Sequence, residues 1–359
     1  MTIQSVLNEL TLPKPVCAGN DFPFAAAYLD HGHVYGMTRG LIDAGGTCRY
    51  VYSPHAKPRE NFLNAFPGVK AVDDFDVILN DPEIKMVASA AITSERAGIG
   101  MKVMQAGKDY FVDKAPFTTL EQLEEAKKVA QATGKKYMVY YGERLHSEAG
   151  MAAGYLLEAG LIGDVVQIIG LGPHRLNAPG RPAWFFEKAR YGGILTDIGS
   201  HQLEQFLHYS GAKDATVAHA MVRNCANPAY PELEDYGEAT LVADNGCSFS
   251  FRVDWLTPDG LGSWGDGRTL ILGTEGYIEL RKQLDIGHSP ERNHVFMVNG
   301  QGQYHENVTG KVGCPFFGQL ITDCLNRTEM ATTQAHAFKA AELSLLCQRY
   351  ADEHPLSVR

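Results

Sequence analysis

The sequence lacks the features that mark a secreted or membrane protein. Its seven cysteines are odd in number, scattered, and never arranged as a Cys-x-x-Cys pair, which argues against a disulfide framework and against a zinc site of that type. No apolar run approaches the roughly 20 residues that span a bilayer, and the first residues carry no basic stretch leading into an apolar one. We therefore expect a cytoplasmic protein that makes no membrane contact.

The chain also lacks an excess of positive charge. Asp and Glu number 42 against 32 Lys and Arg, which gives a net charge of -10 at pH 7. Because an acidic surface repels nucleic acid and anionic lipid, we expect neither as a partner and favour a small-molecule substrate. At 359 residues, of which 45% are hydrophobic, the chain has enough apolar material for two domains.

Short apolar segments alternate with helical patterns in the first part of the chain. Continuous apolar runs are typical of strands that are buried on both faces, and they occur at residues 22–29, 48–52, 85–92, 110–112 and 137–140. Helical patterns at about 33–44 and 95–106 lie between them. This alternation predicts an α/β dinucleotide-binding domain of Rossmann-like type with a parallel sheet, over residues 1–141.

The pattern changes after residue 141. Longer segments with alternating polar and apolar residues, separated by Gly, Asn and Asp, occur at 165–169, 239–242 and 248–255. They predict a substrate-binding α+β domain over residues 142–359 with a mostly antiparallel sheet. An alanine-rich helix over about 334–352 ends the chain and is able to pack on either domain.

The turn after the first strand contains few of the glycines that a dinucleotide site uses. Gly32 holds a standard place, but Asp30 and Tyr35 stand where the first and third glycines are expected. A carboxylate beside a pyrophosphate is unfavourable, so we expect Asp30 to point away or to be neutralised by His31 or His33. We predict cofactor contacts from Asp30, Gly32, His33 and Tyr35; the alternative is a strand-to-helix turn without nucleotide.

Polar residues at the ends of two further strands extend this prediction. Ser53 stands where an acidic residue usually binds the ribose of NAD, and the missing carboxylate admits NADP as well as NAD. Thr93 and Ser94 follow the apolar run that ends at residue 92, at the sheet edge where the cofactor should lie. They equally suit the N-cap of a helix.

Two stretches carry groups suited to proton transfer. Lys114 follows an apolar strand and precedes Ala115-Pro116, which places its amine at the carboxyl edge of the sheet, although a surface lysine is the plainer alternative. Asp197 and His201 are four residues apart in a helix predicted from Thr196 to Gly211, so they share one face. His201 would act as general base and Asp197 would orient it or bind a hydroxyl. A helix cap and a polar helix residue are the alternative.

Other candidates are less specific. His201, Glu204 and His208 form a stripe on the same helix, but no second cluster completes a coordination sphere, so we expect no metal site. His174 and Trp184 follow a strand end and precede the Gly192-Gly193 turn. We predict that both contact the substrate.

These motifs resemble the Gfo/Idh/MocA family, named for glucose-fructose oxidoreductase, inositol dehydrogenase and a rhizopine catabolism protein. The most specific element is Gly-Gly-x-Leu-x-Asp-x-Gly-x-His, here at residues 192–201. The family commonly shows Glu-Lys-Pro, whose lysine contacts cofactor and substrate; here the stretch 113–116 reads Asp-Lys-Ala-Pro, with the proline displaced by one residue. The resemblance covers most of the chain.

The resemblance implies an NAD(P)-dependent oxidoreductase that transfers a hydride between nicotinamide and a secondary hydroxyl of a sugar, cyclitol or related polyol. It implies that Asp197 and His201 transfer the proton, that Arg144 contacts the substrate, and that a large open C-terminal sheet forms a homodimer or homotetramer. Two alternatives remain open. One is an NAD-dependent enzyme that cleaves or eliminates a glycosidic substituent through transient sugar oxidation. The other is a non-catalytic ligand-binding protein, motivated by Asp30 and Tyr35.

Overall fold

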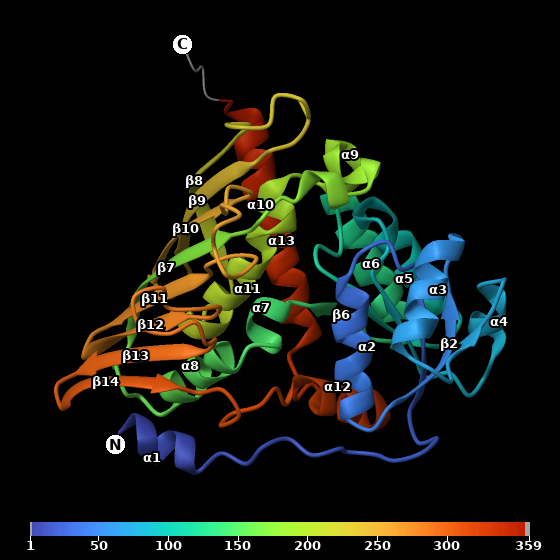
Figure 1. The fold of residues 1–359 in the computed structure, drawn as a ribbon, viewed down its shortest axis with the longest axis horizontal. Coiled ribbons are helices and arrows are strands. Elements are labelled where there is room, and N and C mark those ends of the chain that lie inside the picture. The colour runs from blue at the N-terminus through green and yellow to red at the C-terminus, as the bar shows by residue number, and fades with distance from the viewer. Residues whose placement is uncertain (1, 356–359) are drawn as a thin grey trace. The chain divides into compact units, whose positions relative to one another are not determined.

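The chain forms two compact units that interleave along the sequence. The structure is a computed structural model that describes residues 2–355 (Figure 1). The parallel-sheet unit consists of Pro13–Tyr140 and Pro315–Phe338, and the antiparallel-sheet unit consists of Met1–Leu12, Tyr141–Cys314 and Lys339–Arg359. The sequence predicts one boundary after residue 141 and a last helix able to pack on either domain; the chain passes between the units at four points.

The parallel-sheet unit is built on six parallel strands in the order β3-β2-β1-β4-β5-β6. The strands are β1 (Pro23–Ala27), β2 (Thr47–Tyr52), β3 (Lys70–Ala71), β4 (Met86–Ser89), β5 (Asp109–Asp113) and β6 (Tyr137–Tyr140). The strand order reverses at β1, which has β2 on one side and β4 on the other. In open parallel sheets, ligands bind outside the carboxyl ends of the strands at such a reversal.

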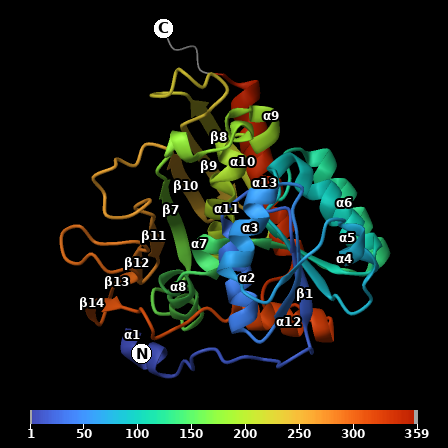
Figure 2. The ribbon, with the colours of Figure 1, turned by 45° about the vertical axis from the view of Figure 1, so that its right-hand side comes forward.

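Helices cover both faces of this sheet (Figure 2). They are α2 (His33–Asp43), α3 (Ala56–Ala65), α4 (Asp76–Asn80), the 3-10 helix η1 (Thr93–Glu95), α5 (Arg96–Gln105), α6 (Leu120–Thr133) and α12 (Phe316–Asn326). Successive side chains of β5 point to opposite faces. Tyr110 lies against Gly100 of α5, and Phe111 packs on Phe316 and Phe317 of α12. This explains why the middle of the strand, residues 110–112, is apolar although Asp109 and Asp113 stand at its ends.

The segment 315–338 is tied to the unit by several contacts far apart in sequence. The ring of Phe317 lies directly over Gly40 of α2, where a Cβ would collide with it. Arg327 forms an ion pair with Asp109 at the start of β5, with Nη1 2.7 Å from Oδ2. α12 is therefore part of the parallel-sheet unit although it follows 174 residues of the other unit in the chain.

The antiparallel-sheet unit has eight strands in the order β14-β13-β12-β11-β7-β10-β9-β8. The strands are β7 (Val165–Pro173), β8 (Ala215–Arg223), β9 (Tyr236–Ala243), β10 (Ser248–Asp254), β11 (Arg268–Gly273), β12 (Gly276–Arg281), β13 (His294–Asn299) and β14 (Gly302–Asn307). β7 and β10 are parallel, and the other neighbouring pairs among the described strands are antiparallel.

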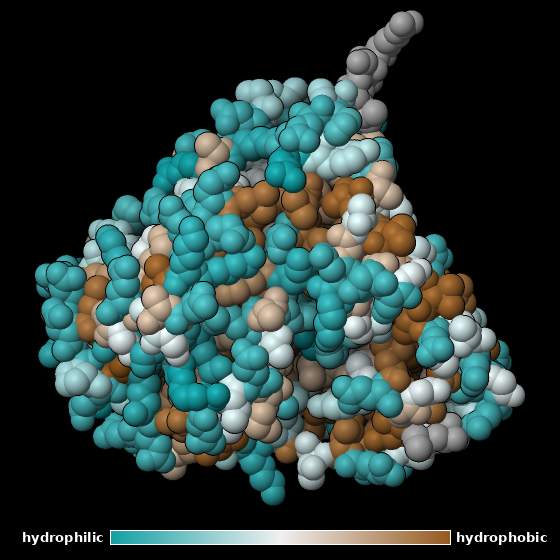
Figure 3. Space-filling view, turned by 180° about the vertical axis from the view of Figure 1, so that it is seen from behind, coloured by the Kyte–Doolittle hydropathy of each residue, from teal (hydrophilic) through white to brown (hydrophobic). Residues whose placement is uncertain are grey.

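Helices cover one face of this sheet, and within the described residues the strands expose apolar side chains to solvent as well. α8 packs on β12 and β13, and α11 packs on β7 and β10. The helices of the unit are α1 (Ile3–Asn8), α7 (Gly142–Leu145), α8 (Glu148–Glu158), η2 (Ala178–Gly180), η3 (Ala183–Phe186), α9 (Lys188–Tyr191), α10 (Ile194–Asp197), α11 (Gly199–Ser210) and most of α13 (Gln334–Glu353). Apolar side chains are exposed on the strands, including Leu270 and Leu272 of β11, and the space-filling view shows hydrophobic patches on a largely hydrophilic surface (Figure 3).

The observed architecture confirms the predicted fold class, an α/β domain with a parallel sheet and an α+β domain with a large, mostly antiparallel sheet. The helix predicted from Thr196 to Gly211 is wrong in one respect, because α10 ends at Asp197 and α11 begins at Gly199. Within residues 2–355, no helix is both long enough and apolar enough to cross a membrane.

Candidate active site

The turn between β1 and α2 leaves open space at the start of a helix. β1 ends at Ala27, and α2 begins at His33 with Gly32 as its N-cap. The backbone N–H of His31 donates to the carbonyl oxygen of Ala90 (2.9 Å), which ties the turn to the segment after β4. The first N–H groups of a helix have no partner within it and attract anions. A Cβ built on Gly32 would meet no atom within 4 Å, so the turn fits a nucleotide pyrophosphate.

A buried carboxylate lies next to this turn. Asp113, the last residue of β5, accepts from Nδ1 of His31 (2.7 Å) on one oxygen and from Nδ1 of His33 (2.8 Å) on the other. Arg96 Nη2 lies 3.3 Å from Oδ2. Burial would raise the pKa of Asp113, but His33, Arg96 and His31 outweigh burial and hold that pKa well below its usual value. Of the two possibilities predicted for Asp30, that it points away or that His31 or His33 neutralises it, the second is not observed, because both imidazoles bind Asp113.

The electrostatics of the turn favour a neutral imidazole at His31. Burial and the neighbouring ring of His33 lower the pKa of His31 to about 4, although Asp113 acts in the opposite direction. Burial also raises the pKa of Asp30, while His55 acts in the opposite direction. At neutral pH the single proton of His31 therefore lies on Nδ1, where it is donated to Asp113.

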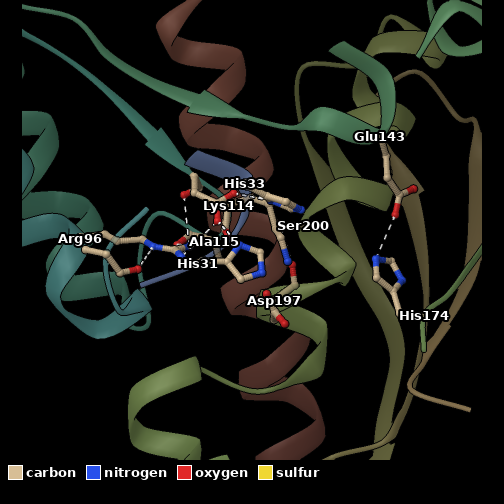
Figure 4. Close-up of polar contacts among 11 residues, drawn as sticks. His31, His33, Arg96, Lys114, Ala115, Glu143, His174, Asp197 and Ser200 are labelled. Atoms are coloured by element: carbon tan, nitrogen blue, oxygen red, sulfur yellow. Dashed lines mark hydrogen bonds and ion pairs between the residues drawn. The ribbon is translucent and has the colours of Figure 1, made fainter. Parts of the chain in front are cut away.

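Arg96 fixes the backbone that carries Lys114. Its guanidinium donates to the carbonyl oxygen of Ala91 (2.7 Å), to that of Ala115 (2.9 Å) and to that of Lys114 itself. Lys114 follows β5 directly and is buried, and the Lys114-Ala115 peptide bond is cis. Figure 4 shows this arrangement, with Arg96, Lys114 and Ala115 close to the two histidines.

The remaining predicted cofactor residues lie around the same end of the sheet or pack inward. Ser53 follows β2, and its hydroxyl accepts from the backbone N–H of His55 (3.2 Å). Thr93 and Ser94 form η1 rather than the N-cap of α5, which is Glu95. Tyr35 is part of α2, and its ring lies on the aromatic side chains of α3 and the residue after it. Its side chain therefore serves packing.

The double glycine of the second motif is required by the backbone. Gly192 and Gly193 have φ angles of 92° and 90°, a region that side chains with a Cβ disfavour. A Cβ on Gly193 would also collide with Gln348. This turn leads into α10, which ends at Asp197, and after Ile198 into α11, which contains His201. Asp197 and His201 are both buried.

A buried polar network lies beside His201. Glu143 of α7 accepts from Lys282 Nζ (3.0 Å) and from Gln202 Nε2 (3.1 Å), and its other carboxylate oxygen lies 3.8 Å from His174 Nε2 (Figure 4). Burial would raise the pKa of Glu143, but Lys282, His201 and His174 outweigh burial and hold that pKa below its usual value. An ionised carboxylate therefore faces His201, and it stabilises positive charge on an imidazole that takes up a proton.

Arg144 makes an internal ion pair. It is buried, and its Nε donates to both carboxylate oxygens of Glu204 at 2.9 and 3.0 Å. The pair ties Arg144 of α7 to Glu204 of α11.

His174 and Trp184 belong to an aromatic region after β7. The ring of His174 lies 4.4 Å from that of Trp264, and Trp184 packs beside Phe185. Next to them is a pocket of about 680 Å³. The pocket is lined by Arg175, Asn177, Gly180, Arg181, Asp259 and Trp264.

Arg181 was not predicted as a site residue. Its guanidinium lies over the rings of Phe185 (4.5 Å) and Trp255 (4.9 Å). Burial lowers the pKa of Arg181, while the carboxylate of Asp197 acts in the opposite direction, so the charges of these two residues interact. Glu143 was also missed, because its partners come from segments far apart in the sequence.

Comparisons with known proteins agree with both units. Residues 24–141 match the family described as "Oxidoreductase family, NAD-binding Rossmann fold", and residues 151–279 match "GFO/IDH/MocA C-terminal domain". A solved structure described as a "putative oxidoreductase" from Erwinia carotovora atroseptica SCRI1043 is 44% identical, with a TM-score of 0.90, covering 92% of this chain and 99% of that one.

Two curated relatives are dehydrogenases. The scyllo-inositol 2-dehydrogenase (NADP(+)) IolW of Bacillus subtilis is 27% identical over 52% of either chain. The D-xylose dehydrogenase of Paenarthrobacter nicotinovorans is 29% identical over 36% of this chain and 34% of that one. The chain thus spans about half or less of the length of these curated relatives. From the family matches and the fold together, the chain belongs to the Gfo/Idh/MocA family of oxidoreductases, and its parallel-sheet unit is an NAD-binding Rossmann domain.

Proposed function

We propose that the chain is an NAD(P)-dependent dehydrogenase that oxidises a secondary hydroxyl of a sugar, cyclitol or related polyol. The observation that carries this proposal is His201, which lies on the motif 192–201 beside the ionised Glu143 in a buried network. A dehydrogenase must take the hydroxyl proton as the hydride leaves, and an imidazole next to a fixed negative charge suits that task. Relatives named as inositol and xylose dehydrogenases support the substrate class.

Each candidate residue has one role in this proposal. His201 takes the proton from the substrate hydroxyl, and Asp197 binds that hydroxyl or its neighbour. Lys114 stabilises the negative charge that develops on the oxygen. When bound, the nicotinamide accepts the hydride.

The cofactor is proposed to lie at the strand-order reversal of the parallel sheet. Gly32 offers open space at the start of α2. Ser53 follows β2, at the position proposed to face the adenosine ribose, and it carries no carboxylate. NAD and NADP therefore both remain candidates. Asp30, His33, Thr93 and Ser94 complete the proposed contacts, and Tyr35 contributes backbone only. His174, Trp184 and Arg144 are proposed to contact the substrate, with Arg144 held by its ion pair with Glu204.

The antiparallel-sheet unit and the cysteines support proposals for assembly and location. We propose a homodimer or homotetramer formed through the exposed face of the eight-stranded sheet, where Leu270 of β11 lies opposite Ile169 of β7. All seven cysteines are free, which supports a reducing compartment such as the cytoplasm.

Turnover of a polyol panel with NAD or NADP tests the function. We expect His201→Ala and Lys114→Ala each to reduce kcat by about 100-fold or more, while NADH still binds His201→Ala. His219→Ala, an exposed histidine on β8, is the matched control and should match the unchanged chain. Full turnover in both site variants would refute the assigned roles. NAD that never exchanges would favour transient oxidation, and absence of nucleotide binding would favour a ligand-binding protein.

A further inference from the structure

The structure brings together three metal-ligand side chains, none of which takes part in the proposed proton transfer and of which only His33 is a proposed cofactor contact. The ligand atoms of His31, His33 and Asp113 all lie within 4.8 Å of one another. Two imidazoles and a carboxylate are a donor set that Zn²⁺ and similar divalent ions bind. We propose that these residues form a site for one divalent cation of the zinc class at the start of α2.

The two histidines are placed by a short sequence spacing at a helix start. They flank Gly32, and their ring centroids are 4.3 Å apart. Asp113 is the last residue of β5. The hydrogen bond from the backbone N–H of His31 to the carbonyl oxygen of Ala90 ties the turn to the segment after β4. The three residues therefore come from two separate segments, both of which belong to the parallel-sheet unit.

The trio needs only a small adjustment to hold an ion. Its N···O distances are 2.7 and 2.8 Å, whereas the ligand atoms of a tetrahedral zinc site lie about 3.3 Å apart, given bonds of about 2.0–2.1 Å. The two distances end on different oxygens of Asp113, Oδ2 for His31 and Oδ1 for His33, so an ion held by both oxygens requires each Nδ1 to withdraw by roughly half an ångström. The side chains of His31 and His33 are 21% and 39% exposed, so both rings have room to move. Binding of the ion through Nδ1 leaves Nε2 of each ring to carry the ring proton.

Arg96 holds the carboxylate in place as a neighbour of the site. It contacts Asp113 Oδ2 and several backbone carbonyl oxygens, so the carboxylate cannot rotate freely. A guanidinium at this distance also weakens the attraction for a cation. Three protein ligands leave at least one coordination position open. An anionic ligand such as inorganic phosphate suits that position, because the first N–H groups of α2 lie beside it.

The competing explanation is that the trio is only a hydrogen-bonded brace between the turn and β5. Metal binding separates the two, because a brace has no stoichiometric affinity for a cation. We would treat the full-length protein with EDTA, remove the chelator, and titrate it with ZnCl₂ by calorimetry without nucleotide or polyol. We expect one Zn²⁺ per chain and a loss of affinity of about 100-fold or more in His33→Ala and in Asp113→Asn.

Control variants address other ligands and folding. His219→Ala and Cys225→Ser, both at exposed positions, should bind Zn²⁺ as the unchanged chain does. Co²⁺ should give visible bands of nitrogen and oxygen coordination without a sulfur charge-transfer band. Because the ring of His33 is partly exposed, His33→Ala should keep the unchanged circular dichroism spectrum even if the buried Asp113→Asn does not.

The outcomes separate this site from the proposed dehydrogenase. Absence of binding, binding that survives His33→Ala, or binding lost in Cys225→Ser would overturn the metal site. A chain that oxidises polyols but binds no cation refutes only this site. A chain that binds one Zn²⁺ through His33 and oxidises nothing supports the site and counts against the dehydrogenase.

Discussion

The buried pair of Glu143 and Lys282 gives a prediction whose size follows from the structure. Their side chains are 6% and 2% exposed, and their charged atoms are 3.0 Å apart. Removing one partner of such a pair leaves an uncompensated buried charge, which typically costs about 3–5 kcal/mol. We expect Lys282→Met to lower the free energy of unfolding by this amount and Glu143→Gln by about 3 kcal/mol.

The double variant decides whether the cost comes from the unpaired charge. Replacing both partners of a buried pair by neutral groups is often close to neutral. Glu143→Gln combined with Lys282→Met should therefore be only about 1–2 kcal/mol less stable than the unchanged chain, far less than the two single costs added together. Glu187→Gln, at an exposed ion pair of the same unit, should change stability by less than about 0.5 kcal/mol.

The tryptophans make this measurement specific to one unit. Trp184, Trp255 and Trp264 are the three tryptophans of the chain, and all belong to the antiparallel-sheet unit. Urea unfolding followed by tryptophan fluorescence therefore reports on the unit that contains Glu143. Additive losses in the double variant would show that the network acts through packing, and would refute the electrostatic argument.

The same pair predicts an acid dependence. The pKa of Glu143 is lowered in the folded state from its usual 4.5, so its stabilisation is fully present above about pH 4.5 and is lost as the pH falls toward the folded value. The unchanged chain should lose stability below pH 4.5 more steeply than Glu143→Gln. Parallel acid dependence in the two proteins would contradict this assignment.

Two further predictions concern helix α5 and the exposed sheet face. In α5, a Cβ on Gly100 would lie 2.5 Å from Tyr110 and Tyr137, whereas a Cβ on Gly98 would meet no atom within 4 Å. In calorimetric melts, Gly100→Ala should lower the free energy of unfolding by about 1–3 kcal/mol and Gly98→Ala should raise it by about 0.4–1 kcal/mol. Equal effects of the two substitutions would refute the packing argument. If the sheet face forms the oligomer, Leu270→Glu should lower the mass found by sedimentation velocity, whereas an unchanged mass would place the interface elsewhere.

Local patterns predicted the elements but not the partners of polar groups. Apolar runs and a double glycine are patterns formed by residues that are neighbours in the sequence. The apolar runs identified β1, β4 and β5 of the parallel sheet, and the glycines at 192 and 193 identified the turn before α10. Glu143 gains its charge state from Lys282, 139 residues away, and Asp113 gains its partners from His31 and His33, about 80 residues away. No periodicity in the sequence predicts ion pairs or hydrogen bonds between residues so far apart in the chain.

Two wrong or incomplete expectations have the same physical origin. The imidazoles of the first turn were considered as partners only for the adjacent Asp30, as one of two alternatives, because sequence reasoning weighs near neighbours; the fold instead brings in Asp113 at the end of β5. The single helix from Thr196 is interrupted at Ile198, where hydrophobic spacing continues across the break. The family motif identified Lys114, Asp197 and His201, whose roles stay predictions.

The interleaving of the two units affects how the parallel-sheet unit folds during synthesis on the ribosome. A nascent chain that has reached Tyr140 contains every strand of the parallel sheet but not α12, whose Phe317 packs on Gly40, nor Arg327, which pairs with Asp109. At about 5–20 residues per second, the ribosome needs roughly ten seconds or more to supply them. Until then the part of the nascent sheet that α12 covers, around Phe111 of β5, is open to chaperones or aggregation, and a chain truncated after Tyr140 keeps that part uncovered permanently.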